Sequence, residues 1–414
     1  MLMSNKTELS TQPYKGVRDF YPTDEFIQRY IMDTWREVCE RYGYAAYNAS
    51  VLEPADLYYA KSSDEIINEQ TYALTDRGDR QVVLRPEMTP TVARMVAGQA
   101  RELGYPLRLY SIPNLFRYER PQRGRLREHW QLNCDLFGDD TLSAEVEIIQ
   151  LSVRLLEAFG ISQDNFTVRI SSRSLLNSHF DKYNLNDEER SDALKLIDRW
   201  HKDEKARAEL ETLFQSTFDL EPDAEIENVI ARLNGLGITN VKFDRTIARG
   251  FNYYTGLVFE VFDNHPNNNR SLFGGGRYDG LVERFGVDAI SVIGFGMGDV
   301  TMRDVLETYE LLPDYVAPAD LCLIANSQPT IEATGALAEE IRNQGINVET
   351  DPTLRKLSTA IKHADKRSTA FIAVVGEDEL SSGVLKLKHL STGDELEVTP
   401  HNVSEVINTF LLEQ

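Results

Sequence analysis

The chain has 414 residues, the length of two or three ordinary domains. Apolar residues make up 42% of it and charged residues 27%, a balance that excludes a disordered or fibrous protein. Because 44 lysines and arginines stand against 66 aspartates and glutamates, the net charge is −22, so the surface as a whole repels polyanions and any polyanionic partner must bind a local basic patch.

The first predicted element is a helix over residues 24–42, where apolar residues recur at helical spacing and Gly43 ends the run. Segments of strand character follow at 81–86, 107–119 and 129–138, then a helical segment at 143–160 and a strand at 166–170. Because several strands arrive in succession without a helix between them, an antiparallel or mixed sheet is favoured over a doubly wound parallel one.

The composition changes at about residues 184–235, which are strongly charged and favour helices. No group of reactive side chains stands out there, so we predict a helical insertion. Strand-like sequence then returns at 241–263, at 271–286 and from 291 onwards.

A segment with two prolines, 311–320, reads as a linker. Beyond it strands and helices alternate, as in a small α/β domain with a largely parallel sheet. We therefore predict one domain over 1–318, which contains the insertion, and a second over 319–414.

Cysteine usage and the first residues indicate a cytoplasmic protein. Cys39, Cys134 and Cys322 lie far apart without a CxxC motif, which argues against a zinc knuckle or a disulfide framework. The first ten residues lack the apolar core of a signal peptide. No apolar run reaches the roughly 18 residues that a membrane span needs. We expect a soluble protein with no tightly bound metal.

Two basic segments interrupt the acidic sequence. Residues 116–128 contain five arginines and two glutamates, and Pro121 and Gly124 predict a hairpin loop between two strands. Its guanidinium groups suit bidentate contacts to phosphate, although a solvated hairpin explains one charge run equally well. Residues 355–367 contain five lysines and arginines against one aspartate.

Three further segments carry side chains suited to binding. Residues 249–256 combine two glycines with Tyr253 and Tyr254, which are either phenol donors or core rings. Residues 274–280 begin with three glycines, which form either a turn or a bed for a flat ligand, and they match neither standard nucleotide-binding loop. Residues 84–89 end in a carboxylate and a hydroxyl that could hold an ammonium group, unless the hydroxyl caps the next helix.

In this order and spacing, these segments resemble the histidyl-tRNA synthetase family of class II aminoacyl-tRNA synthetases. The matching segments are KGVRDF (15–20), RPEMT (85–89), FRYERPQRGRLREHWQ (116–131), RGFNYYTGLVFE (249–260), GGGRYDGLVERFG (274–286), AIKHADKR (360–367) and FIAVVGEDEL (371–380). The resemblance implies an α+β catalytic domain with a mostly antiparallel sheet flanked by helices, followed by a small α/β anticodon-binding domain.

The resemblance also implies a reaction. Members of the family join histidine and ATP, with its Mg²⁺, into histidyl-adenylate and then transfer the histidyl group to the 3′ end of tRNA(His), and a homodimer is implied. Arg117 and Arg249 would be the catalytic cations on the α-phosphate, because charge neutralisation dominates phosphoryl chemistry. The implied ATP contacts are Arg117, Arg125, Arg249 and Arg303.

The remaining site residues follow from the same resemblance. The implied histidine contacts are Glu87, Met88, Thr89, Gln131, Asp135, Tyr253, Tyr254 and Tyr278. Asp135 and Tyr254 match the imidazole contacts. Glu87, Thr89 and Gln131 match the positions that hold the α-amino group. The implied tRNA contacts are Gln122, Arg123, Lys362, Lys366 and Arg367.

Four departures from the family pattern stand out. The arginine that ends class II motif 3 is replaced by Thr301, so Arg303 or a loop arginine substitutes for it, or ATP binds more weakly. Ser50 stands where motif 1 has its proline, and Asn252 and Asp135 replace the usual aspartate and glutamate.

Two other functions compete with the ligase. A catalytically silent paralogue, such as an ATP phosphoribosyltransferase regulatory subunit, shares the catalytic fold but usually lacks the anticodon domain and an intact motif 2. An RNA-binding adaptor does not explain the co-occurrence of Glu87, Gln131, Arg249 and Tyr254. The active ligase is therefore the favoured hypothesis.

Overall fold

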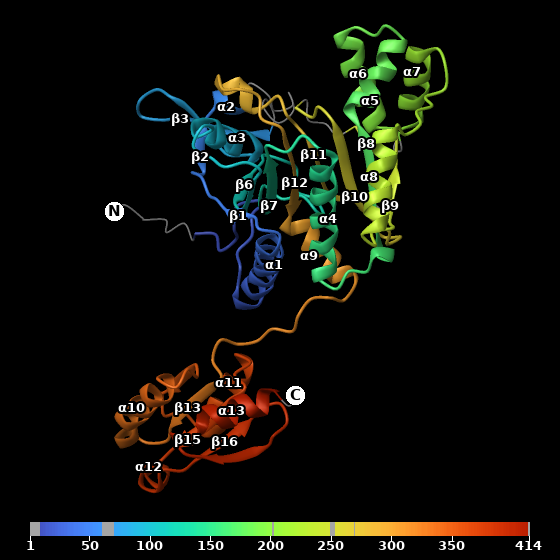
Figure 1. Cartoon of the computed structure of the whole chain (residues 1–414). Coiled ribbons are helices and arrows are strands. Elements are labelled where there is room, and N and C mark those ends of the chain that lie inside the picture. Colours follow the sequence, from blue (N-terminus) through green and yellow to red (C-terminus); the bar gives the residue numbers. More distant parts are fainter. Residues whose placement is uncertain (1–8, 60–69, 201–202, 249–252, 269, 413–414) are drawn as a thin grey trace. The chain divides into compact units, whose positions relative to one another are not determined.

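The computed structural model describes residues 9–59, 70–200, 203–248, 253–268 and 270–412. The chain divides into two compact units, Met1–Leu312 and Pro313–Gln414 (Figure 1). Each unit has its own hydrophobic core. The division falls at the start of the proline-containing segment that the sequence marks as a linker.

A nine-stranded mixed sheet forms the centre of the first unit. Its strands are β1 (Ala45–Ala46), β5 (Leu107–Ser111), β6 (Asn114–Phe116), β7 (Glu128–Phe137), β8 (Phe166–Ser172), β9 (Val241–Phe243), β10 (Leu257–Asp263), β11 (Ser271–Arg277) and β12 (Val292–Gly298). The order is β1-β5-β7-β12-β11-β10-β8-β9, and β6 pairs with β7. The β1–β5 and β8–β9 pairs are parallel and the others are antiparallel. The predicted mixed sheet is confirmed.

Helices cover one face of this sheet. They are α1 (Pro22–Arg41), α4 (Leu142–Ala158), α8 (Ala224–Gly235) and α9 (Asp299–Thr308), and their apolar faces share one core with the strands. Helix α1 begins two residues before its predicted start because proline suits the first helical turn. Helix α4 begins where the Thr141 hydroxyl accepts a hydrogen bond from the Ser143 amide.

The opposite face of the sheet is covered in part by α3 (Thr89–Gly98), which packs with Phe137, Val258 and Val292. A small antiparallel sheet leads into this helix. Its strands are β2 (Leu52–Pro54), β3 (Tyr72–Thr75) and β4 (Gln81–Leu84), in the order β2-β4-β3, with the short helix α2 (Asp56–Tyr59) beside them. The chain therefore passes from β4 of the small sheet through a short connection into α3, which packs on the main sheet.

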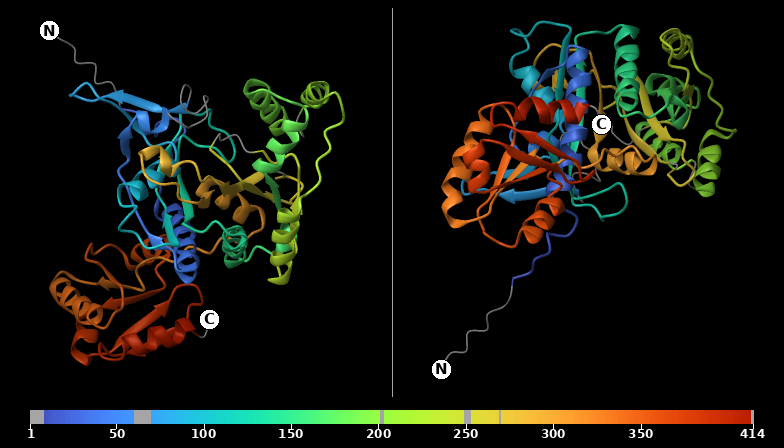
Figure 2. Two further views of the ribbon diagram at one scale, coloured as in Figure 1. Left: turned by 45° about the horizontal axis from the view of Figure 1, so that its top comes forward. Right: turned by 90° about the horizontal axis from the view of Figure 1, so that it is seen from below.

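A separate helical cluster lies beyond β8. Helices α5 (Arg173–Lys182), α6 (Asp187–Asp198) and α7 (Glu204–Phe214) bury an aromatic core of their own that includes Phe180, Phe214 and Phe218. These green elements project from the β8–β9 end of the sheet (Figures 1 and 2). Helix α8 lies within the predicted insertion but packs into the main core through Ile226, Val229 and Leu233.

The second unit is a five-stranded sheet with helices. Its strands are β13 (Leu321–Ala325), β14 (Val348–Asp351), β15 (Phe371–Val375), β16 (Leu385–His389) and β17 (Glu395–Val398), in the order β14-β13-β15-β16-β17. Strands β13, β14 and β15 are parallel and the last two are antiparallel. The helices are α10 (Ile331–Arg342), α11 (Leu357–Lys366), α12 (Glu377–Ser382) and α13 (Val403–Leu412).

Three short 3₁₀ helices complete the described elements: η2 (Gln163–Asn165), η3 (Val282–Phe285) and η4 (Gln328–Thr330). In the described part of the chain, no helix combines the length and apolarity that a membrane crossing needs.

Candidate active site

Strand β7 connects the core to a cavity because its side chains alternate between the two faces of the sheet. Leu132, Cys134 and Leu136 point into the core that α1 and α4 cover. On the opposite face, Gln131 and Asp135 line a cavity, as does Asn133 between them.

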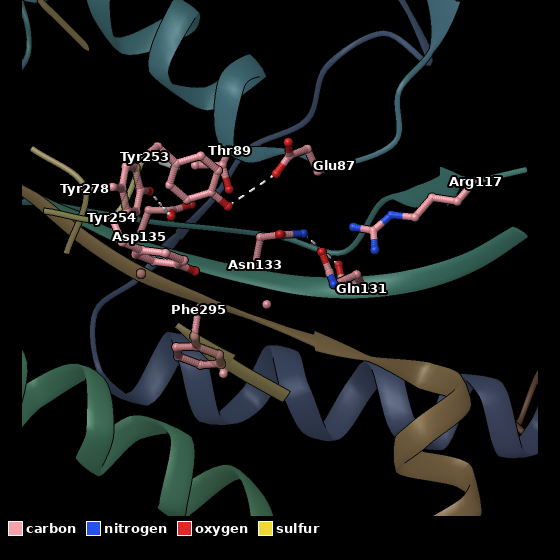
Figure 3. A pocket seen from close by; sticks show the side chains of 13 residues that line it. Glu87, Thr89, Arg117, Gln131, Asn133, Asp135, Tyr253, Tyr254, Tyr278 and Phe295 are labelled. Carbon is pink, nitrogen blue, oxygen red and sulfur yellow. Dashed lines mark hydrogen bonds between the residues drawn. The ribbon is translucent and has the colours of Figure 1, made fainter. Parts of the chain in front are cut away.

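The cavity brings together residues from six separate segments of the chain. Seven of the eight predicted histidine contacts line it: Glu87, Thr89, Gln131, Asp135, Tyr253, Tyr254 and Tyr278. Arg117 lines it as well. Arg117 lies at one end and Asp135 with two tyrosines at the other, and Gln131 and Asn133 lie between them (Figure 3). The exception is Met88, whose side chain is fully buried.

Glycines of β11 and β12 form the floor of the cavity. Gly294 pairs with Asp135 of β7 and with Gly276 of β11, and Gly296 pairs with Asn133 and with Gly274. A Cβ atom at Gly294 would lie 2.3 Å from Asp135 Oδ1, and one at Gly296 would lie 2.9 Å from the Gln131 Cδ atom. The three consecutive glycines lie within strand β11, so the alternative of a turn is wrong. Of the three, Gly274 lines the cavity together with Gly294 and Gly296 of β12.

Asp135 carries an unusual carboxylate. The Tyr278 hydroxyl donates a hydrogen bond to its Oδ1 atom, whereas Oδ2 has no partner among the described residues. Burial raises the pKa of Asp135 to about 7, and the Tyr278 hydrogen bond only partly opposes this shift. The group is therefore poised between its charged and neutral forms near neutral pH.

Two buried hydroxyls on this side of the sheet were not predicted from the sequence. Tyr47 Oη and Ser111 Oγ are buried and also lack a hydrogen-bond partner within the described ranges. Burial raises the pKa of Tyr47 well above 10, and the Asp135 charge adds to the shift while Ser111 opposes it. Ser111 pairs in register with Asn133, so its side chain faces the same side of the sheet. No local pattern marks either residue.

Glu87 and Thr89 lie where β4 passes into α3. Glu87 is buried, and its Oε2 atom accepts a hydrogen bond from the Tyr253 hydroxyl at 3.3 Å. Thr89 is the first residue of α3, and no side-chain hydrogen bond caps that helix, so the alternative that its hydroxyl is a cap is wrong. A carboxylate, a hydroxyl and the Gln131 amide thus border one part of the cavity.

Arg117 is fixed at the opposite end. Its Nε atom donates to the Pro86 carbonyl at 2.9 Å, and the two terminal nitrogens extend toward the cavity (Figure 3). Burial, followed by the charges of Arg117 and Arg18, lowers the pKa of His129 to about 3, so this neighbour is neutral. Arg249, the second predicted cation, and Asn252 lie outside the described residues.

The arginine loop, residues 117–127, connects β6 and β7, which pair from Phe116 to Glu128 as a hairpin. Its tip is a tight turn in which Gln122 and Arg125 exchange backbone hydrogen bonds and Gly124 has a φ of 78°. Arg123 pairs with Asp304 at 2.7 Å and Arg125 lies 3.5 Å from Glu119. The loop is therefore held by specific contacts.

Arg303 lies away from the cavity. On α9 it pairs with Asp24 and Glu307, both at 2.9 Å. It borders a different cavity with Arg18 and Gly124. The predicted ATP contact at Arg303 is therefore not brought together with Arg117.

The remaining predicted contacts lie at two surfaces. Gln122 and Arg123 are exposed at the tip of the arginine loop. Lys362 and Lys366 are exposed on α11 of the second unit. Arg367 follows them and pairs with Glu349 at 2.6 Å.

Comparison with known proteins decides the family. The family model for histidyl-tRNA synthetase matches residues 16–224 and 203–298, and that for an anticodon-binding domain matches 321–409. The chain belongs to the histidyl-tRNA synthetase family. A histidine–tRNA ligase of Leptospira biflexa is 37% identical over 94% of this chain and 95% of the relative, and one of Haloarcula marismortui is 33% identical over 93% and 94%.

Solved structures support the same synthetase fold. A histidyl-tRNA synthetase from Nostoc sp. PCC 7120 matches with a TM-score of 0.79 at 23% identity, covering 97% of this chain and all of that one. A chain from Bacillus halodurans described as an ATP phosphoribosyltransferase regulatory subunit/histidyl-tRNA synthetase matches with a TM-score of 0.70 at 24% identity, covering 89% of this chain and all of that one. The predicted class II fold with a separate C-terminal domain is confirmed.

Proposed function

We propose that this chain is a histidine–tRNA ligase that forms histidyl-adenylate and transfers the histidyl group to the 3′ end of tRNA(His). Curated ligases resemble it over more than nine-tenths of its length. The observation that carries the proposal is a single cavity with a buried carboxylate at one end and an arginine at the other.

The carboxylate end would bind the substrate imidazole. Asp135 can accept a hydrogen bond from a ring N–H, and the Tyr254 and Tyr278 rings border the same space. Glu87, Thr89 and Gln131 would hold the α-ammonium group, because all three offer acceptor oxygens and Glu87 is a carboxyl group. A buried site of this kind rejects analogues that leave its polar groups unpaired.

The arginine end would bind the α-phosphate. During adenylate formation a histidine carboxylate oxygen bonds to the α-phosphorus while the bond to the bridging oxygen breaks and pyrophosphate leaves. Negative charge accumulates at this centre, so a fixed guanidinium such as that of Arg117 lowers the barrier. We retain Arg249 as a second cation in the proposal, together with Arg125 as an ATP contact.

Mg²⁺ would enter with ATP. Across the described residues no group of three or more histidine, cysteine, aspartate or glutamate side chains could hold a metal ion. Mg²⁺ in ATP-dependent enzymes is commonly bound through the substrate phosphates together with one or two carboxylates. We extend the proposal to a homodimer, which the family resemblance implies, and to the cytoplasm, which the cysteine usage indicates.

The silent-paralogue alternative has less support. The Bacillus halodurans structure shows that the shared fold alone does not separate the two functions. The chain nevertheless combines the match to an anticodon-binding domain with an arginine loop whose first arginine faces the cavity. A regulatory subunit needs neither feature.

Pyrophosphate exchange tests the proposal. Purified protein should incorporate labelled pyrophosphate into ATP when histidine is present and not with other amino acids. The assay needs no tRNA, so it isolates adenylate formation. Histidine binding without any exchange would reject the ligase and favour the silent paralogue.

Replacing Lys362 and Lys366 together by alanine should weaken tRNA binding and leave exchange unchanged. Both side chains are exposed on α11, where they can contact phosphates. Each lost phosphate contact lowers the slope of log affinity against log salt by about one, so we expect a decrease of about two. The KM for tRNA in aminoacylation measures the weakening.

The matched control replaces Lys386 and Lys388 on β16 of the same unit, which changes the charge equally. These lysines lie near Glu397 and Glu395. If the control weakens tRNA binding as much as the α11 variant, the effect is general charge and α11 is not a specific contact.

A further inference from the structure

Thr301 leaves the start of α9 without a positive charge at the position where the family resemblance predicts an arginine. Its hydroxyl donates to the Gly298 carbonyl at 2.9 Å, which completes the junction between β12 and α9. The Thr301 side chain is therefore neutral and hydrogen-bonded to the backbone. A cation for the ATP phosphates would have to come from another segment.

Arg270 lies beside this position. Its Nη1 atom donates to the Arg123 carbonyl at the tip of the arginine loop, at 2.6 Å. A Cβ atom at Gly124 would lie 2.6 Å from the same Nη1 atom and 3.7 Å from Thr301 Cγ2. The Arg270 guanidinium and the Thr301 methyl group thus lie on either side of one point, the position that a Cβ atom at Gly124 would occupy.

The strand register places this point beyond the arginine end of the cavity. Arg270 immediately precedes β11, in which Gly274 lines the cavity four residues later. Strand β11 runs antiparallel to β12, so its beginning lies beside the end of β12 and the start of α9. The direction from Asp135 to Gln131 along β7 is therefore the direction toward the beginning of β11, where Arg270 lies. A triphosphate whose α-phosphate lies at Arg117 would extend in this direction.

Arg270 also differs from its neighbours in charge. Arg123 pairs with Asp304, and Arg18 pairs with Asp299. Arg303 pairs with both Asp24 and Glu307. Arg125 lies 3.5 Å from Glu119. Arg270 donates to a neutral carbonyl, and in the described part of the chain no carboxylate pairs with it. Its positive charge is therefore available for an anion.

We propose that Arg270 binds the terminal phosphates of ATP and so supplies the charge that Thr301 lacks. This inference rests on the proposed ligase function. In the reaction, the bond between the α-phosphorus and the bridging oxygen breaks, and its electron pair leaves on pyrophosphate. Arg270 stabilises that leaving charge, while the Arg117 guanidinium stabilises the α-phosphate.

Three variants and two nucleotides test this role. Arg270→Ala should raise the dissociation constant for ATP by roughly 10- to 100-fold, because a charge-assisted contact is lost. Binding of AMP, which has no terminal phosphates, and binding of histidine should not change. Thr301→Arg added to Arg270→Ala should restore much of the ATP affinity, because both side chains flank the same point. Calorimetry measures each dissociation constant without turnover.

Arg270→Gln separates charge from loop anchoring. The glutamine amide can still donate to the Arg123 carbonyl, but it is neutral. If Arg270 only anchors the loop, the glutamine variant will bind ATP normally and the proposal is overturned. Equal losses of ATP and AMP affinity, or no loss in Arg270→Ala, would overturn it as well.

The control is Arg36→Ala, which removes an arginine that is exposed on α1 and pairs with Asp33. It should leave ATP binding unchanged, and a comparable loss in it would attribute the effect to net charge and overturn the proposal. If the unmodified protein binds ATP more tightly than AMP but shows no exchange, the ligase function fails while the Arg270 result still stands. If exchange is normal and Arg270→Ala has no effect, only the Arg270 assignment fails.

Discussion

Asp135→Asn should stabilise the fold and at the same time weaken histidine binding at least tenfold. Burial raises the pKa of Asp135 to about 7, well above its ordinary value near 3.8. As the pH rises from about 4 to 7, the unfolded chain loses this proton while the folded chain keeps it, so the free energy of unfolding falls with pH. Asparagine removes that cost, which is on the order of a few kcal/mol above pH 7.

Asparagine also fits the surroundings. Its oxygen can still accept from the Tyr278 hydroxyl, and its NH₂ group carries no charge whose burial would cost free energy. Urea denaturation at pH 5 and pH 8 measures the effect, which should be larger at pH 8. The control Asp140→Asn removes an exposed carboxylate. Equal gains in the two variants, or a gain that does not depend on pH, would contradict the assignment.

The same residue predicts how histidine binding depends on pH. As the pH rises through about 7, Asp135 becomes a carboxylate that accepts a hydrogen bond from the imidazole, so the KM for histidine should fall between pH 6 and 8. Tyr47 and Tyr278 face this group, but their pKa values are raised well above 10, so they stay protonated in this range. In Asp135→Asn only the titration of the substrate should remain. An unchanged pH profile would exclude Asp135 from imidazole recognition.

Arg117→Ala should lower the rate of histidine-dependent pyrophosphate exchange by about 10²–10³-fold. The loss is this large because a preorganised positive charge at the reacting phosphate acts mainly on the transition state. Histidine affinity should stay nearly the same, because Asp135, which would bind the imidazole, lies at the opposite end of the cavity from Arg117 (Figure 3). Steady-state exchange kinetics together with calorimetric histidine binding separate the two effects.

A matched control is Arg101→Ala, which removes an exposed arginine that follows α3. It should exchange at the normal rate. Arg117→Lys keeps the charge but loses the planar fork and the bond to the Pro86 carbonyl, so an intermediate rate is expected. A normal rate in Arg117→Ala would remove this residue from the mechanism.

Local sequence signals predicted much of the fold. The apolar period from residue 24 to 42 predicted α1, and the pattern at 129–138 predicted β7, because both elements bury one face in the main core. Pro121 and Gly124 predicted the hairpin loop, since they disfavour regular structure. The three glycines were ambiguous because glycine usually interrupts strands. Here a Cβ atom at Gly275 would lie 2.0 Å from the Gly294 carbonyl oxygen, and one at Gly276 would lie 2.6 Å from that of Leu257, so the close approach of the neighbouring strands requires glycine at both positions.

Contacts between distant segments could not be predicted in this way. Tyr47 comes under the influence of the Asp135 charge because β1 pairs with β5 and β5 pairs with β7. No local pattern encodes these pairings. Arg270 meets Arg123 across 147 positions of the chain. Arg303 was predicted to contact ATP from the family resemblance, as a substitute for the missing motif 3 arginine. The carboxylates of Asp24 and Glu307 that engage it become visible only in three dimensions.

The glycine floor limits how the substrate range of this protein can be altered. Gly274, Gly294 and Gly296 already have the smallest possible side chain, so no substitution there can enlarge the cavity for a bulkier histidine analogue. Any substitution there can only shrink it. Acceptance of N-methylated or ring-extended analogues must instead come from shortening the aromatic wall, at Tyr254 or Tyr278. An engineering library is therefore best directed at the tyrosines.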